Sequence, residues 1–293
     1  MDDRDAARHA YAETVCATAN VCLPALRAAF ACVARERFLG PGPWQVMRSL
    51  PTPGEGINET TADADPRHLY ADILVAIDPA RYLNNGQPSA LARWIDALDL
   101  CTGDRVLHVG CGVGYYTAIL AEVVGPLGHI TAIDIDADLA QRARTHLAPW
   151  PQVEVVTGDG GQLDTGPCDA IFVNAGATHP RPLWLERLRP RGRLLVPLTV
   201  NIDGAPFAGV GWGGMLKIAT SGDAFAAQWV SPVGIFHCAD ARDPGVERRL
   251  REAFERGGWE AVRSLRVMSH AAGETCWLHA PGFCLSTLPP PAA

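Results

Sequence analysis

Apolar and polar positions alternate along the chain in a pattern that becomes regular after residue 89. Short apolar runs typical of buried strands are followed by runs of helical period, which predicts a mostly parallel sheet covered by helices. The predicted strands are RVLHVG (105–110), HITAIDID (129–136), QVEVVTGD (152–159), DAIFVNAG (169–176) and GRLLVPLTV (192–200). The predicted helices cover 89–98, 115–124, 137–147 and 182–188, and Ser89 is expected to cap the first of them.

Regions of different character flank this alternating core. The alanine-rich residues 5–37 predict two helices separated near Leu23 and Pro24, and the Pro-, Gly- and Asp-containing residues 50–66 predict a long surface loop. LYADILVAI (69–77) fits either a strand or a short helix. Beyond residue 200, the runs MLKIAT, FAAQWVSPVGIF and CWLHAPGFCL predict antiparallel strands, with a helix over 245–256.

Composition narrows the class of protein. A net charge of −7 in 293 residues argues against a nucleic-acid binder that neutralises phosphates. The mixed-charge segments RERF (35–38) and ERRLRE (247–252) are interpreted as solvated helix faces. Nine cysteines without a C-x-x-C pair indicate neither a disulfide framework nor a zinc knuckle, so we expect no metal site. With no apolar leader or membrane-length run, we expect a cytoplasmic protein that does not bind membranes.

The candidate chemistry begins at Gly110, Gly112 and Gly114, which follow the first strand of the core. Glycines allow the backbone to approach a ligand closely, and the helix that follows offers free N–H groups. On its own, the motif also fits an ordinary strand-to-helix turn. The dinucleotide motif G-x-G-x-x-G needs a third glycine at the position of Tyr115. The shorter G-x-G-x-G spacing is usual in class I S-adenosylmethionine methyltransferases.

Polar residues stand at the ends of the next three strands. Asp134 ends the second strand, where a carboxylate can accept from both ribose hydroxyls, although an acid there also suits an NAD enzyme. Asp159 and Gly160 follow the third strand, where the carboxylate can accept from an adenine amino group. Asn174 ends the fourth strand. Ligands of open α/β sheets bind at this edge.

These segments resemble the protein-L-isoaspartate O-methyltransferase family. The resemblance is carried, in order, by VLHVGCGVGYYTA, AIDID, GDG, DAIFVNAGA and LRPRGRLLVPL. Upstream, ARERF (34–38) is similar to the family's Pro-Arg-Glu-x-Phe segment, and Tyr70-x-Asp72 to its Tyr-x-Asp. The resemblance covers about residues 25–240 and implies a class I methyltransferase fold that binds S-adenosylmethionine and methylates a carboxylate.

Two positions depart from the family pattern. His108 stands where the family usually has Asp, and we interpret it as a histidine packed at a strand end. The family's substrate loop is also altered. A register without gaps places Asn84 at the family's Ser position and Ser89 at its His position. The resemblance therefore implies the cofactor more firmly than the acceptor.

We expect an α/β fold with a Rossmann-like class I methyltransferase sheet, an N-terminal helical cap and a β-rich C-terminal extension. The expected divisions are 1–88 (cap and substrate loop), 89–240 (cofactor-binding core) and 241–293 (extension). The expected cofactor-binding residues are His108, Gly110, Cys111, Gly112, Gly114, Tyr115, Asp134, Ile135, Asp159, Gly160 and Asn174. The catalytic candidates are Asn84 and Ser89, and the substrate-binding candidates are Asn85, Gln87, Thr178 and His179.

Three functions stay open at this point. The first is O-methylation of a carboxylate in a peptide or protein, as in isoaspartyl methyltransferases. The second is methylation of a secondary metabolite or of a ribosomally made peptide, with a small-molecule carboxylate among the acceptors. The third is a catalytically silent protein that binds the cofactor and uses the fold for partner contact.

Overall fold

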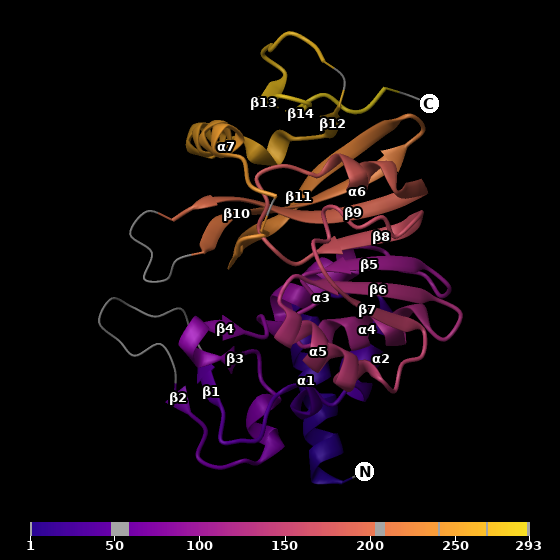
Figure 1. Ribbon diagram of the computed structural model, residues 1–293, viewed down its shortest axis with the longest axis vertical. Helices are drawn as coiled ribbons and strands as arrows, with labels where there is room; N and C mark the ends of the chain where they lie inside the picture. Colours follow the sequence, from indigo (N-terminus) through magenta and orange to yellow (C-terminus); the bar gives the residue numbers. More distant parts are fainter. Residues whose placement is uncertain (1, 48–58, 203–208, 240, 268, 292–293) are drawn as a thin grey trace. The chain divides into compact units, whose positions relative to one another are not determined.

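The computed structural model describes residues 2–47, 59–202, 209–239, 241–267 and 269–291 (Figure 1). The chain forms two units, each assembled from three stretches. The first unit comprises 1–103, 111–132 and 136–157, and the second comprises 104–110, 133–135 and 158–293.

The second unit contains the strands that follow the predicted pattern. Its strand order is β13-β14-β12-β11-β10-β9-β8-β5, with the end of β6 beside β5. β5, β8 and β9 pair in parallel, whereas β9 to β14 pair in antiparallel fashion. The strands are β5 (Arg105–Val109), β6 (His129–Asp134), β8 (Cys168–Val173), β9 (Leu188–Asn201), β10 (Val210–Ser221), β11 (Ala224–Phe236), β12 (Ser264–Arg266), β13 (Cys276–Ala280) and β14 (Phe283–Ser286).

The direction of the strand order changes at β5, which has β6 on one side and β8 on the other. Ligands of open α/β sheets bind outside the carboxyl ends of the strands at such a switch point. The described residues of this unit include the helices α6 (Pro182–Glu186) and α7 (Pro244–Arg256) and the short 3-10 helix η4 (Trp259–Ala261). The parallel core and the antiparallel C-terminal extension expected from the sequence are both present.

The first unit holds the N-terminal helices. α1 (Asp3–Ala19) starts at Asp2, whose side chain accepts from the Asp5 amide, and it ends at Asn20 in the left-handed conformation. Pro24 opens α2 (Pro24–Cys32), so the predicted separation of two helices is confirmed. The remaining helices are α3 (Pro88–Ala97), α4 (Tyr115–Val124) and α5 (Ala137–Leu147). β7 (Val153–Thr157) pairs with the start of β6.

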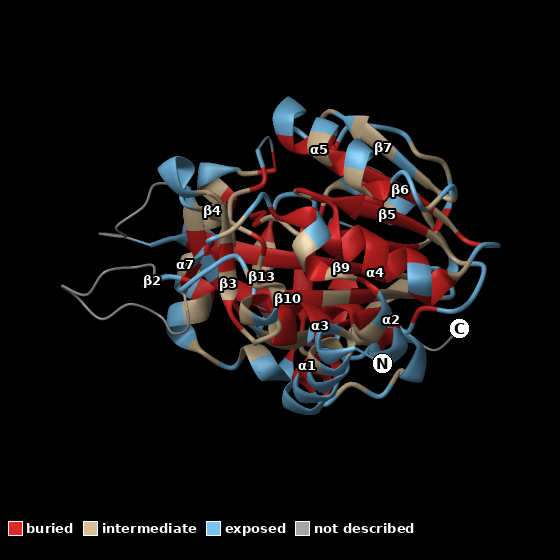
Figure 2. Cartoon of the chain, turned by 90° about the horizontal axis from the view of Figure 1, so that it is seen from below, coloured by how far each residue is buried: buried red, intermediate tan, exposed pale blue. Residues whose placement is uncertain are grey.

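Helix α4 is buried on almost all sides, as its red colour in Figure 2 shows. Its sequence YYTAILAEVV has Glu122 as its one charged residue, and a helix that is apolar all round belongs inside a protein. No helix among the described residues combines the length and apolar character needed to cross a membrane.

The first unit also contains a small antiparallel sheet that the sequence did not predict. Its order is β2-β1-β3-β4, formed by β1 (Gln45–Met47), β2 (Glu59–Thr60), β3 (Leu74–Asp78) and β4 (Leu83–Asn84). Three 3-10 helices accompany it, η1 (Arg35–Phe38), η2 (Pro66–Leu69) and η3 (Pro79–Arg81). Six buried side chains form its core, namely Leu39, Trp44, Val46, Leu69, Ile73 and Val75.

Three local predictions need correction or qualification. Ser89 is not the cap of α3, because the helix begins at Pro88 and its N-cap position is Gln87. Segment 69–77 holds the end of η2 and most of β3, which settles the alternative in favour of a strand. Residues 50–58 of the predicted loop lie outside the described residues, while residues 59–66 contain β2 and the start of η2.

Candidate functional site

The carboxyl ends of β5, β6 and β8 meet in the second unit. The Gly110 amide donates to the Ile133 carbonyl (2.8 Å), and the Asn174 amide donates to the Val109 carbonyl (2.8 Å). The Gly158 amide donates to the Asp134 carbonyl (2.9 Å). These bonds bring together the strand-end positions that the sequence singled out, at the edge where ligands of such sheets bind.

The two carboxylate oxygens of Asp159 differ in their hydrogen bonding within the described chain. Its Oδ1 accepts from the Gly161 amide at 2.7 Å, in the turn after the third strand. Its Oδ2 is buried and accepts no hydrogen bond from the described part of the chain. Burying a polar atom without a partner is costly, so this oxygen fits a ligand that brings an N–H donor. Gly160 beside it has no room for a side chain, because a Cβ there would lie 2.6 Å from Val109 Cγ1.

Asp134 and Ile135 form a polar and apolar pair at the end of β6. Asp134 is buried to 8% exposure, whereas the neighbouring Ile135 is 54% exposed. An exposed branched side chain directly after a buried strand offers an apolar surface to a flat ligand group. The pair therefore fits a nucleoside, with hydroxyls near the acid and a base near the isoleucine.

The glycine loop continues from the second unit into the first. A Cβ on Gly110 would lie 3.1 Å from the Asn174 carbonyl oxygen, so the close approach of β5 to β8 needs glycine. Gly112 has φ +56° and no described atom within 4 Å of a Cβ, so backbone conformation rather than packing selects glycine there. Gly114 is the N-cap of α4, and Cys111 is buried with its Sγ toward the Gly112 carbonyl (3.7 Å).

His108 is completely buried in β5. Its ring stacks on Phe172 of β8, with centroids 5.0 Å apart and an interplanar angle of 12°. Burial lowers the pKa of its imidazole to about 3, so the ring is neutral at neutral pH. The position that is acidic in the family therefore carries no charge here, in line with our interpretation of a packed histidine.

Tyr115 lies in the aromatic core of the first unit. Its ring packs edge-on against Phe30 and Phe38, and its hydroxyl lies 3.3 Å from the hydroxyl of Tyr11. The Arg35 guanidinium lies about 6.0 Å from the centroid of the Tyr115 ring. These packing contacts explain why an aromatic residue stands at position 115. A contact of Tyr115 with a cofactor stays a prediction.

The polar turn at 84–89 is held by Asp72 of the Tyr70-x-Asp72 motif. The Asp72 carboxylate accepts from the Ser89 amide (2.8 Å), the Ser89 hydroxyl (2.6 Å) and the Gln87 amide nitrogen (3.1 Å). The Asn84 side chain accepts from the Gly86 amide at 2.9 Å. The candidates of this turn are thus brought together in the first unit, and Asp72 organises them.

Arg35 is a central residue of the first unit that the sequence analysis misread. It belongs to the segment interpreted as solvated, yet its side chain is completely buried. Its guanidinium donates to the carbonyls of Leu69, Ala71 and Ile73 and to Asn85 Oδ1 (2.7–3.1 Å). The prediction for RERF was wrong for Arg35, because its partners lie more than 30 residues away and leave no local signal.

The side-chain oxygen of Asn85 connects Arg35 to β3, and its side-chain nitrogen makes no hydrogen bond within the described chain. Its Oδ1 also accepts from the Val75 amide at 3.1 Å. Its Nδ2 is buried and has no hydrogen-bond partner among the described residues. An unpaired amide donor fits a carboxylate or carbonyl oxygen of a ligand.

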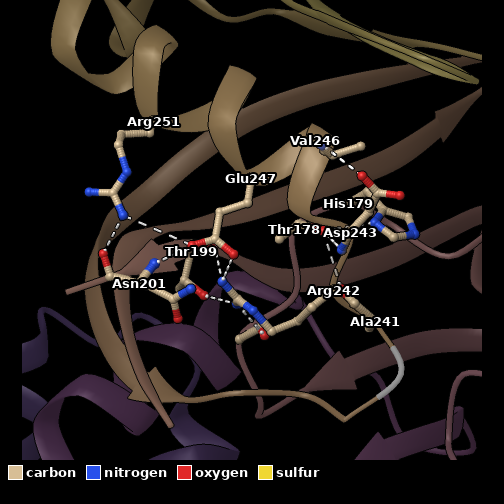
Figure 3. Close-up of polar contacts among 11 residues, drawn as sticks. Thr178, His179, Thr199, Asn201, Ala241, Arg242, Asp243, Val246, Glu247 and Arg251 are labelled. Carbon is tan, nitrogen blue, oxygen red and sulfur yellow. Dashed lines mark hydrogen bonds and ion pairs between the residues drawn. The ribbon is translucent and has the colours of Figure 1, made fainter. Parts of the chain in front are cut away.

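Thr178 and His179 follow β8 and meet the C-terminal extension (Figure 3). Thr178 is completely buried, and its Oγ1 accepts from the Asp243 amide (2.9 Å) and lies 3.0 Å from His179 Nδ1. Burial, and secondarily the charge of Arg181, lower the pKa of His179. His179 lines a cavity of about 480 Å³ together with Asp243, Gly245, Val246, Arg248, Arg249, Glu252 and Pro281.

Arg242 fastens the segment after β8 to the extension, as the dashed lines in Figure 3 show. Its guanidinium donates to the Gly176 carbonyl (3.1 Å), to Thr199 Oγ1 (3.0 Å) and to Glu247 Oε2 (2.8 Å). Glu247 Oε1 in turn accepts from the Asn201 amide at 2.7 Å. Glu247 belongs to ERRLRE, which was interpreted as a solvated face, so that prediction was wrong for Glu247; Arg242 was not among the predicted residues.

The fold and the strand-end residues define a class I S-adenosylmethionine-dependent methyltransferase. The model of the family Protein-L-isoaspartate(D-aspartate) O-methyltransferase (PCMT) matches residues 61–205. Protein-L-isoaspartate O-methyltransferase 2 of Archaeoglobus fulgidus is 39% identical over 151 residues, covering 47% of this chain and 68% of the relative. The chain belongs to the protein-L-isoaspartate O-methyltransferase family.

Solved structures agree on the fold. A protein-L-isoaspartate O-methyltransferase superposes with a TM-score of 0.63 at 21% identity, covering 85% of this chain and 69% of that chain. A Plasmodium falciparum protein assigned to the same family, solved in complex with S-adenosyl-L-homocysteine, gives a TM-score of 0.58 at 15% identity. That match covers 79% of this chain and 97% of the other. The residues after 205, including β10 to β14 and α7, lie outside the family model.

Proposed function

We propose that this chain transfers the methyl group of S-adenosylmethionine to a carboxylate oxygen of a peptide or protein. The observation that carries the cofactor assignment is the buried Asp159 Oδ2, which has no hydrogen-bond partner among the described residues. It stands after the third strand, where an adenine amino group would donate to it. Family membership supports the reaction, and the relatives named above are isoaspartyl methyltransferases.

The proposed cofactor contacts come from the ends of successive strands. Asp134 would accept from the ribose hydroxyls, Ile135 would pack against the adenine ring, and Asp159 would accept from its amino group. The backbone at Gly110 and Gly112 would approach the methionine part of the cofactor. Of the remaining candidates, Cys111, Gly114, Gly160 and Asn174 are proposed to shape this loop and strand edge, and His108 to pack beneath it.

The reaction needs positioning rather than acid–base chemistry. When bound, S-adenosylmethionine supplies a methyl group on a sulfonium sulfur, which leaves as a neutral thioether as the carboxylate oxygen forms its new bond. An ionised carboxylate is already a nucleophile, so the chain has to hold it in line and exclude water. Well-oriented reactants can gain on the order of 7–11 kcal/mol in this way.

Each unit holds its own candidates for acceptor contacts, the turn at 84–89 in the first unit and the segment after β8 in the second. In the turn, the unpaired Asn85 Nδ2 is a donor suited to an acceptor oxygen. In a register without gaps, the resemblance puts Asn84 at the family's Ser position and Ser89 at its His position, and Gln87 is the exposed member of the turn. His179 lines the cavity beside α7, whereas Thr178 is buried and would act by holding its neighbours.

A second acceptor class is favoured by the extension. The residues after 205 have no counterpart in the family model, and Arg248 and Arg249 line the cavity beside His179. Asp243 and Glu252 line the same cavity, so its charged side chains are of both signs. We therefore keep a ribosomally made peptide beside isoaspartate-containing proteins as an acceptor.

Transfer of a radiolabelled methyl group tests this function. The acceptors are an isoaspartyl peptide, the matched aspartyl peptide, acidic peptides and a panel of small carboxylic acids. We expect labelling of a peptide acceptor, and loss of S-adenosylhomocysteine binding in Asp159→Asn by calorimetry. Transfer to small acids alone would move the assignment to metabolite chemistry. Cofactor binding without transfer to any acceptor would support the silent alternative, and binding of NAD instead would refute the cofactor.

Two further assignments are proposals. We propose a cytoplasmic location, because none of the nine cysteines is in a disulfide and a reducing compartment keeps cysteines in that state. We also keep the division into 1–88, 89–240 and 241–293 as a working scheme for truncations.

A further inference from the structure

A second group of chemistry-bearing side chains lies in the C-terminal extension. His270, Cys276, His279 and Cys284 each offer one ligand atom, and these atoms all lie within 4.8 Å of one another. Cys284 is buried and the other three are partly buried. All four belong to the second unit and lie beyond the stretch matched by the family model.

The backbone explains why these four side chains meet. Three of them lie on the hairpin of β13 and β14, where His279 and Cys284 are paired directly across the strands. Cys276 and His279 are three positions apart and would point to opposite faces of a regular strand. The register shifts between Cys276 and Leu278, so an extra residue at this bulge turns Cys276 to the same side.

The segment before the hairpin supplies the fourth side chain. His270 Nε2 lies 3.4 Å from Cys276 Sγ, and the rings of His270 and His279 are 4.9 Å apart in an edge-to-face arrangement. The Nδ1 of His279 is buried and has no hydrogen-bond partner among the described residues. A buried ring nitrogen of this kind calls for a partner.

The spacing of the ligand atoms is close to that of a tetrahedral metal site. Zinc bonds of about 2.3 Å to sulfur and about 2.0–2.1 Å to nitrogen place neighbouring ligand atoms roughly 3.3–3.8 Å apart. The longest separation, 4.8 Å, therefore has to shorten by about 1.0–1.5 Å, a shift within reach of side-chain rotation. Two thiolates and two imidazoles are the ligand set of structural zinc, and four protein ligands leave no open position for catalysis.

We propose that His270, Cys276, His279 and Cys284 bind one structural zinc ion. The ion links the β13–β14 hairpin to the segment around His270 and stabilises this part of the extension. On binding, the two thiols release two protons to solvent, and the thiolates balance the charge of Zn²⁺. The lack of C-x-x-C pairs led to the prediction of no metal, whereas the motif here is H-x5-C-x2-H-x4-C.

Metal content of the purified full chain tests the proposal directly. We expect about one zinc per chain, by mass spectrometry of the element, after dialysis under reducing conditions. Cys276→Ser and His270→Ala are expected to lose most of it. Cys101→Ser and His9→Ala are matched controls at exposed positions and are expected to keep it. Equal zinc content in wild type and Cys276→Ser would overturn the proposal.

Titration of the chelator-treated chain gives a second readout. Zinc chloride alone should bind in a one-to-one ratio with release of about two protons, and cobalt chloride should give a thiolate charge-transfer band. Far-UV circular dichroism checks that His270→Ala, whose residue lies outside the strands, keeps its fold. A disulfide between Cys276 and Cys284 in the unreduced intact mass, or a cobalt spectrum without thiolate bands, would refute the site.

Discussion

The imidazole of His108 stacks on the ring of Phe172, with planes 12° apart and centroids 5.0 Å apart. The two residues lie directly opposite each other on the parallel strands β5 and β8. Complete burial of this pair holds the imidazole in its neutral form. The strand that leads into the glycine loop is therefore anchored by an aromatic contact instead of a charged residue.

The buried imidazole predicts how stability depends on pH. The pKa of His108 is about 3 in the folded chain, whereas an unfolded histidine titrates near 6.5. Between these values the unfolded chain binds the extra proton, so acid lowers the free energy of unfolding by up to about 1.4 kcal/mol per pH unit. Urea unfolding at pH 7.5, 6 and 4.5 measures the free energy of unfolding. This free energy should decrease less on acidification in His108→Asn than in wild type. Identical losses would contradict this assignment.

We expect replacement of Arg35 to destabilise the first unit strongly. Arg35→Met removes the donors to the buried carbonyls of Leu69 and Ile73, to the partly buried carbonyl of Ala71 and to Asn85. Each unsatisfied buried group costs about 1–3 kcal/mol, so we expect a decrease of about 3–5 kcal/mol in the free energy of unfolding. Arg37→Met, an exposed position of the same 3-10 helix, should change it by less than about 0.5 kcal/mol. Similar effects of the two variants would show that the Arg35 contacts add little.

Asp134 predicts a selective loss of cofactor affinity. Hydrogen bonds to a charged group contribute about 1.5–3 kcal/mol. If the Asp134 carboxylate accepts from the ribose hydroxyls, Asp134→Ala should therefore weaken S-adenosylhomocysteine binding by about 10- to 100-fold. Asp138→Ala, an exposed acid at the start of α5, serves as the control and should bind normally. Calorimetry on both variants measures the difference, and unchanged affinity in Asp134→Ala would remove the ribose role.

We expect the interaction between Arg242 and Glu247 to stabilise the fold by an amount that depends on pH. Hydrogen bonds from the Asn201 amide and Arg242 lower the pKa of Glu247 against the opposing effect of burial. The stabilisation is therefore present above the unfolded pKa of about 4.5 and is lost as the pH falls through the lower folded value. A double-mutant cycle with Arg242→Gln and Glu247→Gln should give about 1–2 kcal/mol of coupling at pH 7, and less at pH 3.5. Arg248→Gln with Glu247→Gln is the control pair, and equal coupling there would argue against a specific contact.

The alternating core was predictable because its signals are local. The glycine loop, Asp134, Asp159 and Asn174 each stand at the end of a short apolar run, and the structure gathers the strand ends as expected. The spacing of apolar residues and the residue types of the loops are visible in a short stretch of sequence, so they locate these positions without knowledge of distant residues. The family resemblance added the cofactor class.

What sequence reasoning missed depends on partners far along the chain. Arg35 and Glu247 stand in mixed-charge runs that fit solvated faces, and only the fold supplies their buried acceptors and donors. The hydroxyl of Ser89, expected as a cap, is instead held by Asp72. The group around Cys276 escaped notice because a bulge, which leaves no clear trace in the sequence, sets the direction of its side chain.

The interleaving of the two units has a consequence for synthesis of the chain on the ribosome. All stretches of the first unit have been made once Thr157 emerges, whereas the second unit needs 158–293 to pair with the early stretch 104–110. The pairing of β5 with β8 must therefore wait until β8 has been made. A nascent chain stalled before residue 168 would leave the β8 side of β5 unpaired, and an unpaired strand edge favours aggregation.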